Sequence, residues 1–365
     1  MKGTRFIIAG GGTGGHIFPA IAIANEIKRR MPGATILFVG ATGKMEMEKV
    51  PQAGYAIEGI TIAGFNRSSL IKNIQLPFKL VKSFIQVQQI FKNFKPEAVI
   101  GVGGYSSFPV LKYAQVKGLP TFLHESNLFA GKSNTLLSKK ASKVFTAAAG
   151  MEKFFPAGKI VVTGNPVRKA IVQNEITRQE GLDHFNLKPG NQVVLSVGGS
   201  LGAKSINEAI AKGINLFNAN NLQLIWQTGK PFIAQGLQVS KEATNVYVND
   251  FIQQMEYAYA AADIVISRSG AMAIAELCLV KKPVIFVPYP FAAEDHQTAN
   301  AKTLVDKEAA LILTDKEAAE KLIKEVILLS KDTELQNKLK RNISPLGIPN
   351  ADEKIVNEIL AFLNI

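Results

Sequence analysis

Five glycines and a histidine follow the first apolar run of the chain, within the stretch Gly10–His16. The run before them, Arg5–Ala9, is typical of a buried parallel strand, and Pro19–Ile27 behind them is typical of a helix. A glycine turn between a strand and a helix presents backbone N–H groups at the helix N-terminus, where they can bind phosphate. Because glycine has no Cβ, the backbone can also approach a ligand closely. The chemistry indicated is recognition of a phosphate or diphosphate.

The same stretch fits the dinucleotide-binding pattern Gly-x-Gly-x-x-Gly, at Gly10, Gly12 and Gly15. That pattern also requires an acidic residue at the end of the next strand, where it binds a ribose hydroxyl. The next apolar run is 35–39, and no acid follows it until Glu46. The sequence therefore favours a bulky diphosphate or sugar over a hydride carrier. A tight turn that binds nothing is the remaining alternative.

Two further glycine loops follow apolar runs, at Gly101–Ser107 and Ser196–Ala203. Three such loops in one chain are a more specific phosphate-binding signal than one. Polar side chains follow other runs, at 124–127, 250–252, 267–271 and 294–300. Since the carboxyl ends of parallel strands line the ligand site of an open sheet, these side chains are well placed to bind.

Two of these segments suit a nucleotide sugar. Arg268 follows a strand and can face a diphosphate, while the carboxylate of Glu276, about two turns into the next helix, can accept both hydroxyls of a ribose. The imidazole of His296 and the amide of Gln297 suit sugar hydroxyls. Asp295 instead suits a helix N-cap, and the two interpretations are compatible.

The elements that must position these residues alternate regularly. Apolar strands and helical stretches follow one another along the chain, which predicts an α/β protein with parallel sheets covered by helices. Strands are expected at 5–9, 35–39, 56–61, 97–102, 120–124, 143–146 and 160–163, and then at 192–197, 222–227, 245–249, 263–267, 283–287 and 309–313. A length of 365 residues fits two domains, which we expect at 1–163 and 164–345, with a hinge at 164–166.

The positive charge lies in the first half. Residues 1–163 contain 21 Lys and Arg against 7 Glu and no Asp, whereas residues 164–365 contain 21 Lys and Arg against 22 acidic residues. The first half therefore carries +14 and the second −1. This predicts an anionic partner for the first half, a phosphorylated substrate or an anionic membrane surface. Nucleic acid is disfavoured, because no zinc finger or aromatic RNA-binding motif is present.

Other classes of protein are disfavoured by composition. Cys278 is the only cysteine, so neither an intrachain disulfide nor a cysteine metal site is expected. We see no uncharged apolar run of the ~20 residues that span a bilayer. The first strand begins close to Met1, which leaves no room for a signal peptide, so the cytoplasm is the expected compartment.

Residues 69–94 carry more apolar side chains than one helix stripe requires. The surplus lies among Lys72, Lys79, Lys82 and Lys92. One interpretation is a helix that packs on the sheet. The other is an apolar surface, flanked by lysines, that enters a membrane. The sequence leaves both open.

In these residues the chain resembles the MurG family of bacterial N-acetylglucosaminyltransferases. The matching segments are GGTGGHIFPA at 11–20, GVGGYSSFP at 101–109, HESN at 124–127, TGNPVR at 163–168, VGGSLGA at 197–203, FI at 251–252, RSGAMAIAE at 268–276 and EDHQTANA at 294–301. The resemblance implies a GT-B fold, with two Rossmann-like domains across a cleft and a C-terminal helix, about 346–365, returning to the first domain. It also implies transfer of GlcNAc from UDP-GlcNAc to the 4-hydroxyl of MurNAc-pentapeptide on undecaprenyl pyrophosphate, in peptidoglycan synthesis at the cytoplasmic face of the inner membrane.

The resemblance assigns the donor to the second domain and the acceptor to the first. For the donor it implies contacts from Arg168, Ser200, Phe251, Ile252, Arg268, Glu276, His296 and Gln297. It places Thr13, Gly14, Gly15 and Asn127 at the donor and also facing the lipid-linked pyrophosphate and sugar of the acceptor, and it places Gly103, Gly104 and Tyr105 on the acceptor. Ile74, Phe78, Val81 and Phe84 correspond to the membrane patch of the family, although the family's tryptophan there is absent.

The bond formed implies inversion by one direct displacement, which needs a base at the acceptor hydroxyl. His16 is the first candidate and Glu125 the second. No Asp-x-Asp motif is present, so no metal or other cofactor is expected, and helix N-termini with Arg168 and Arg268 must stabilise the leaving diphosphate. A UDP-GlcNAc 2-epimerase and a non-catalytic UDP-sugar-binding protein are the alternatives.

Overall fold

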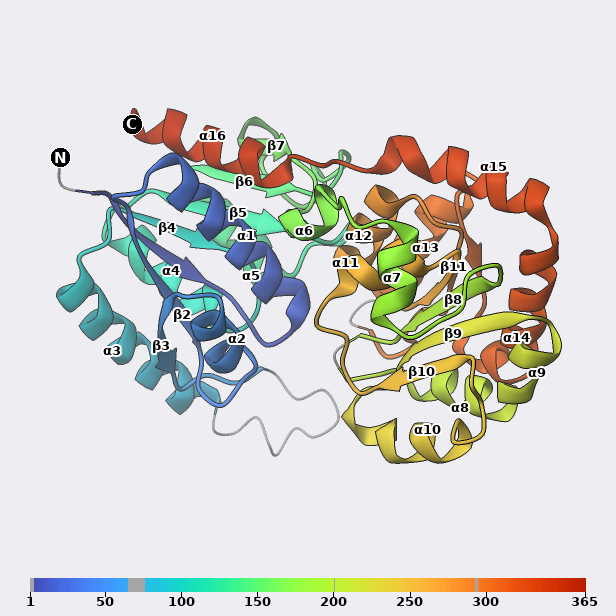
Figure 1. Cartoon of the computed structure of the whole chain (residues 1–365). Coiled ribbons are helices and arrows are strands. Elements are labelled where there is room, and N and C mark those ends of the chain that lie inside the picture. Colours follow the sequence, from blue (N-terminus) through green and yellow to red (C-terminus); the bar gives the residue numbers. More distant parts are fainter. Residues whose placement is uncertain (1–2, 65–75, 200, 293–294) are drawn as a thin grey trace. The chain divides into compact units, whose positions relative to one another are not determined.

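The chain folds into two compact units, residues 1–168 with 350–365, and residues 169–349. The computed structural model in Figure 1 describes residues 3–64, 76–199, 201–292 and 295–365. Each unit contains one parallel β-sheet with helices on its faces. The α/β class expected from the sequence is thus confirmed.

The sheet of the first unit has the order β3-β2-β1-β4-β5-β6-β7, and all neighbours are parallel. Its strands are β1 (Arg5–Ala9), β2 (Thr35–Ala41), β3 (Ala56–Ile60), β4 (Ala98–Gly101), β5 (Thr121–Glu125), β6 (Lys143–Thr146) and β7 (Ile160–Val162). Its helices are α1 (Gly14–Arg30), α2 (Glu46–Gln52), α3 (Leu76–Phe94), α4 (Ser107–Val116), α5 (Lys132–Ser138), η2 (Ala157–Lys159) and α16 (Ala351–Leu363).

Alternating residues of β1 divide the core of this unit into two layers. Phe6 and Ile8 belong to a buried cluster with residues of α1 and α16. Ile7 and Ala9 belong to a second cluster with residues of α3 and α4. Because successive side chains of a strand point to opposite faces, an apolar run such as β1 buries both faces of the sheet.

The second unit repeats the arrangement with the order β10-β9-β8-β11-β12-β13. Its strands are β8 (Gln192–Val197), β9 (Leu222–Gln227), β10 (Val246–Asn249), β11 (Ile264–Ser267), β12 (Val284–Phe286) and β13 (Leu311–Ile312). Its helices are α6 (Lys169–Val172), α7 (Arg178–His184), α8 (Lys204–Lys212), α9 (Ile214–Ala219), η3 (Lys230–Phe232), α10 (Ile233–Val239), α11 (Met255–Ala261), α12 (Ala271–Val280), α13 (His296–Val305), α14 (Asp315–Lys331), α15 (Thr333–Ile343) and η5 (Ser344–Leu346). Every strand predicted from the sequence is present, with ends that differ by two residues at most.

Strand order reverses between β1 and β4 in the first sheet and between β8 and β11 in the second. Such switch points open a crevice at the carboxyl ends of the two strands, where ligands bind in open α/β sheets. The loop Gly10–Gly15 follows β1 and the loop Gly101–Ser107 begins at the end of β4, while Ser196–Ala203 begins at the end of β8. Thus each of the three glycine loops lies at a switch point.

The last helix, α16, belongs to the first unit although it is last in the chain. It lies against α1, where Arg30 donates to Asn357 Oδ1 at 2.5 Å. On the neighbouring sheet Lys143 of β6 pairs with Glu358. Ile355 and Ile359 complete the cluster beneath Phe6. Residues of α16 therefore complete a core cluster that also contains residues of β1.

Candidate active site

The first two glycine loops lie against each other at the switch point of the first unit. The backbone N–H of Gly11 donates to the Gly103 carbonyl at 3.3 Å, and the Ser107 hydroxyl lies 2.8 Å from the same carbonyl oxygen. Gly104 has φ +86°, and a Cβ there would lie 2.3 Å from the Gly11 oxygen. Only glycine fits at 104, because both its backbone conformation and its close neighbour exclude a side chain.

A buried carboxylate forms hydrogen bonds that hold the first glycine loop in place. Glu46, 1% exposed, accepts the N–H of Gly12 at 2.8 Å and the N–H of Ala41 at 2.9 Å. In the sequence, Glu46 stands out only as the first acid after the strand 35–39, too late to be the ribose ligand of a dinucleotide site. Its contacts instead give it the task of holding the glycine loop to the end of β2. The only local signal in the sequence is an acid in the first turn of a helix, and this signal does not identify the Gly12 N–H as its partner.

His16 joins the two loops. Its Nδ1 lies 3.1 Å from the Gly11 carbonyl oxygen and 3.3 Å from the Thr13 hydroxyl. A carbonyl oxygen can only accept, so in the neutral ring this contact places the proton on Nδ1 and the lone pair on Nε2. The ring edge faces the second loop, since a Cβ on Gly103 would lie 2.8 Å from Nε2. This tautomer suits a general base.

Glu125, the second candidate base, ends β5 and is 5% exposed. Its carboxylate accepts the N–H groups of Asn127 at 3.1 Å and Gly131 at 3.2 Å, and the side-chain amide of Asn134 at 2.9 Å. The Asn127 side chain adds a contact at 3.3 Å. These four donors hold the carboxylate in place, so the geometry also suits a residue that shapes this loop.

His124, directly before it, is fully buried. Burial lowers the pKa of its imidazole to about 4, against a smaller opposing effect of a backbone hydrogen bond with Gly164. The ring is therefore neutral at pH 7. Among the remaining predicted residues of this unit, Tyr105 is 58% exposed, and the Arg168 guanidinium lies 5.1 Å from the centre of the Phe18 ring on α1.

In the second unit, predicted donor residues gather at the carboxyl ends of the strands. Phe251 and Ile252 follow β10, and Ile252 is 4% exposed. Glu276 is half-buried on α12, where its Oε2 accepts the Tyr259 hydroxyl at 3.1 Å. The tyrosine thus orients the carboxylate that was expected to bind a ribose.

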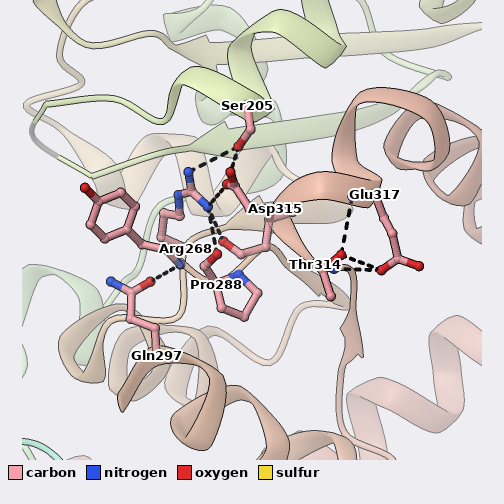
Figure 2. A network of polar contacts seen from close by, with 9 residues as sticks. Ser205, Arg268, Pro288, Gln297, Thr314, Asp315 and Glu317 are labelled. Carbon is pink, nitrogen blue, oxygen red and sulfur yellow. Dashed lines mark hydrogen bonds and ion pairs between the residues drawn. The ribbon is translucent and has the colours of Figure 1, made fainter. Parts of the chain in front are cut away.

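Arg268 is the centre of a polar network (Figure 2). Its Nη1 donates to the carbonyls of Val287 at 2.9 Å and Pro288 at 3.0 Å, and to Asp315 Oδ1 at 2.6 Å. Its Nη2 donates to the Ser205 hydroxyl at 3.2 Å. These bonds tie the ends of β11 and β12 to α8 and α14. Contact with a diphosphate, expected from the sequence, stays a prediction beside this structural role.

The predicted sugar-binding pair opens α13, whose first residue is His296. Gln297 Oε1 accepts the N–H of Tyr289 at 3.0 Å, and the Ser269 hydroxyl donates to the Gln297 carbonyl at 2.9 Å. The pair is thereby held to the segments that follow β11 and β12. Predicted residues Ser200 and Ile74 lie outside the described residues.

The proposed membrane residues lie on α3. Phe78 and Val81 are 76% and 62% exposed, and Phe84 is half-buried. Val87 and Ile90 of the same helix are buried in the core. One face of the helix therefore packs on the sheet, while apolar side chains near its start remain exposed, and entry of these side chains into a membrane stays a prediction. None of the described helices is both long and apolar enough to cross a bilayer.

Two family models match the chain in order along its length. The glycosyltransferase family 28 N-terminal domain matches residues 6–146, and the glycosyltransferase family 28 C-terminal domain matches residues 193–355. This chain belongs to glycosyltransferase family 28. The family 28 assignment accounts for the two sheets and for the glycine loops at both switch points, and it identifies the chain as a glycosyltransferase of GT-B fold.

Relatives extend the family 28 assignment over the whole chain. A Phocaeicola vulgatus protein named UDP-N-acetylglucosamine--N-acetylmuramyl-(pentapeptide) pyrophosphoryl-undecaprenol N-acetylglucosamine transferase is 49% identical over 358 residues, 97% of this chain and 95% of that protein. A Parabacteroides distasonis protein of the same name is 47% identical over 366 residues, all of both chains. The crystal structure of Acinetobacter baumannii MurG matches with a TM-score of 0.76 and 29% identity over 98% of this chain and 99% of that one. The expected membership of the MurG group is confirmed.

A more distant structure bears on one alternative. The UDP-GlcNAc 2-epimerase from Neisseria meningitidis, solved with UDP-GlcNAc bound, has a TM-score of 0.69 over 98% of this chain and all of that chain. Its sequence identity is 16%, so the likeness shows a shared fold alone. Within the described ranges, no group of three His, Cys, Asp or Glu side chains is arranged to hold a metal ion.

Proposed function

We propose that this enzyme transfers GlcNAc from UDP-GlcNAc to the 4-hydroxyl of MurNAc-pentapeptide on undecaprenyl pyrophosphate, with inversion at C1. The observation that carries the proposal is near-full-length identity of 46–49% to proteins named for this transfer. The geometry at the two switch points supports it, because each presents glycine loops suited to a pyrophosphate.

The second unit binds the donor in this proposal. Glu276, oriented by Tyr259, accepts the ribose hydroxyls, and the segment at Ile252 contacts the base. The glycine loop after β8, which includes Ser200, contacts the diphosphate together with Arg268. His296 and Gln297 contact the GlcNAc hydroxyls.

The first unit binds the acceptor through its two joined glycine loops, the second of which carries Tyr105, and through Asn127. His16 Nε2 accepts the proton of the acceptor 4-hydroxyl while that oxygen bonds to C1 of GlcNAc. The bond between C1 and the UDP oxygen breaks in the same step, and its electron pair leaves with the diphosphate. Backbone N–H groups at helix N-termini stabilise that charge.

The acceptor's lipid tail leaves the bilayer only at a high cost in exposed apolar surface. We therefore place the first unit at the cytoplasmic face of the inner membrane. The charge of +14 on residues 1–163 attracts an anionic leaflet, and exposed Phe78 and Val81 enter the interface.

Product analysis tests the proposal. The purified chain is incubated with UDP-GlcNAc, with and without a lipid-pyrophosphate MurNAc-pentapeptide acceptor. We expect UDP and a β-1,4-linked disaccharide product only when the acceptor is present. Formation of UDP-ManNAc without acceptor would support the epimerase instead. Binding of UDP-GlcNAc without any turnover would support a non-catalytic protein.

A further inference from the structure

The end of β9 carries a buried amide that joins two loops of the second unit. Gln227, the last residue of the strand, is 2% exposed. Its Nε2 donates to the Gly199 carbonyl at 3.0 Å, and its Oε1 accepts the N–H of Ile252 at 3.0 Å. Both hydrogen-bonding ends of one side chain are therefore used, one on the glycine loop after β8 and the other on the segment after β10.

The two residues that follow hold the same junction through the backbone. The N–H of Thr228 donates to the Asn249 carbonyl at 2.9 Å, and that of Gly229 donates to the Asp250 carbonyl at 3.0 Å. Gly229 has φ +75°, and a Cβ there would lie 2.4 Å from the backbone N of Gly202. The turn after β9 thus lies directly between the two loops, and Gln227 is the side chain that links them.

We propose that Gln227 is a positioning residue that couples the diphosphate loop to the base-binding segment. The proposal rests on the proposed function, in which these two segments bind the diphosphate and the uracil of the donor. The N–H of Ile252 and the carbonyl of Phe251 belong to one planar peptide, so the bond from Gln227 fixes the direction of both. The glycine loop, whose Leu201 side chain is 77% exposed, is fixed by the other end of the amide.

A fixed peptide matters for the choice of base. Uracil presents an N–H donor between two carbonyl acceptors, whereas cytosine presents an unprotonated ring nitrogen beside an amino group. Backbone groups distinguish these patterns only when their directions are fixed, because the wrong base then leaves a polar group unpaired. Gln227 therefore contributes to nucleotide specificity without touching the nucleotide.

The same strand provides a matched control. Gln223, also 2% exposed, accepts the N–H of Lys188 at 2.7 Å and donates to the Lys188 carbonyl at 2.7 Å. It makes the same kind of buried two-sided bond, but with the segment that precedes β8. Gln223→Met and Gln227→Met each remove two such bonds from β9, so their losses of stability are comparable.

Calorimetry with UDP, CDP and uridine on the full chain tests the proposal. For Gln227→Met we expect UDP affinity to fall about 10-fold or more, as two lost buried bonds would give, and the ratio of UDP to CDP affinity to fall with it. Gln223→Met should keep both the affinity and the ratio of the wild type. If Gln227→Met has the same UDP affinity and the same ratio as Gln223→Met, the proposal is wrong.

Gln227→Glu distinguishes the two hydrogen bonds of the Gln227 side chain, and it is the variant to use if Gln227→Met does not fold. Its carboxylate still accepts the N–H of Ile252 but cannot donate to Gly199. Uridine affinity should therefore stay near the wild-type value while UDP affinity falls; equal losses for both ligands would contradict the proposal. Wild-type protein that does not bind UDP would overturn the proposed function as well, whereas UDP binding that Gln227 does not affect overturns this inference alone.

Discussion

The carboxylate of Glu46 accepts the backbone N–H of Gly12 at 2.8 Å, across a separation of 34 residues in the chain. The other oxygen of that carboxylate accepts the N–H of Ala41. The acid therefore stabilises a loop that has several glycines and little conformational preference of its own. It also occupies the Gly12 N–H, so a bound pyrophosphate must use N–H groups further along the loop.

Replacing Glu46 should impair transfer and leave donor binding unchanged. Glu46→Ala leaves the buried N–H of Ala41 unpaired, at a cost of about 1–3 kcal/mol in the free energy of unfolding, and removes the partner of the Gly12 N–H. We expect kcat to fall in steady-state kinetics, while calorimetry with UDP gives the wild-type affinity. Glu48→Ala, on the same helix and with a side chain 66% exposed, is the control. If Glu46→Ala turned over as fast as Glu48→Ala, the loop would not depend on this carboxylate.

His16→Ala tests the base. We expect kcat to fall by about 10²–10⁴-fold, because the acceptor hydroxyl loses its proton acceptor, while UDP affinity stays near normal. His184→Ala, at an exposed histidine of the second unit, should be fully active. If His16→Ala turned over at the wild-type rate, the general base would be Glu125 or no side chain at all.

His124 should make stability depend on pH. Its pKa is about 4 in the folded protein and 6.5 in an unfolded chain, so between these values the unfolded chain binds a proton that the native protein does not. The free energy of unfolding is therefore highest above pH 6.5 and falls as the pH is lowered towards 4, by about 3 kcal/mol from this group. Denaturant titrations from pH 7.5 to 4 measure it. His124→Gln should lose this part of the pH dependence, and an unchanged difference between pH 7 and pH 4 would contradict the assignment.

Glu276→Ala should weaken UDP binding by about 1–3 kcal/mol, through loss of charge-assisted hydrogen bonds to the ribose. Tyr259→Phe should have a smaller effect, about 1 kcal/mol, because it removes only the hydroxyl that orients the carboxylate. Calorimetry with UDP measures both. An unchanged affinity in folded Glu276→Ala would remove this residue from the site.

Binding to vesicles tests the membrane surface. We expect the chain to bind anionic vesicles at low salt, to release them as salt increases, and to bind neutral vesicles poorly, at about 1 kcal/mol per nearby Lys or Arg. Changing Phe78, Val81 and Phe84 together to Ser should reduce vesicle binding and turnover on a long-chain acceptor, but not on a short-chain soluble one.

Because Phe84 is half-buried, its replacement could unfold the protein, and a thermal melt of the triple variant checks this. The double variant Phe78→Ser, Val81→Ser changes only exposed side chains and avoids the risk. Leu328→Ser, at a 61% exposed leucine of the second unit, is the matched surface change. Wild-type protein that ignores anionic vesicles, or a folded triple variant equally active on both acceptors, would contradict the proposal.

The sequence by itself determined the strands, the family and the segments that form the site. Apolar runs such as Arg5–Ala9 and Gln192–Val197 read as buried strands because both faces of a parallel sheet are covered. Glycines after these apolar runs indicate the loops, because few other residues can adopt the backbone conformations of a tight turn. These signals lie within a few residues of the structure they specify, so a single sequence reveals them.

Tertiary structure alone decided how the site is held. Glu46 and Gln227 carry no local pattern, because, apart from Ala41, each bonds to backbone groups 25 or more residues away that only the folded sheet brings near. The division of α3 into buried Val87 and exposed Phe78 likewise depends on which face meets the sheet, which an apolar band wider than one helix stripe does not specify. A buried polar group must find its partner wherever the chain supplies one, and for these residues the fold determines where that is.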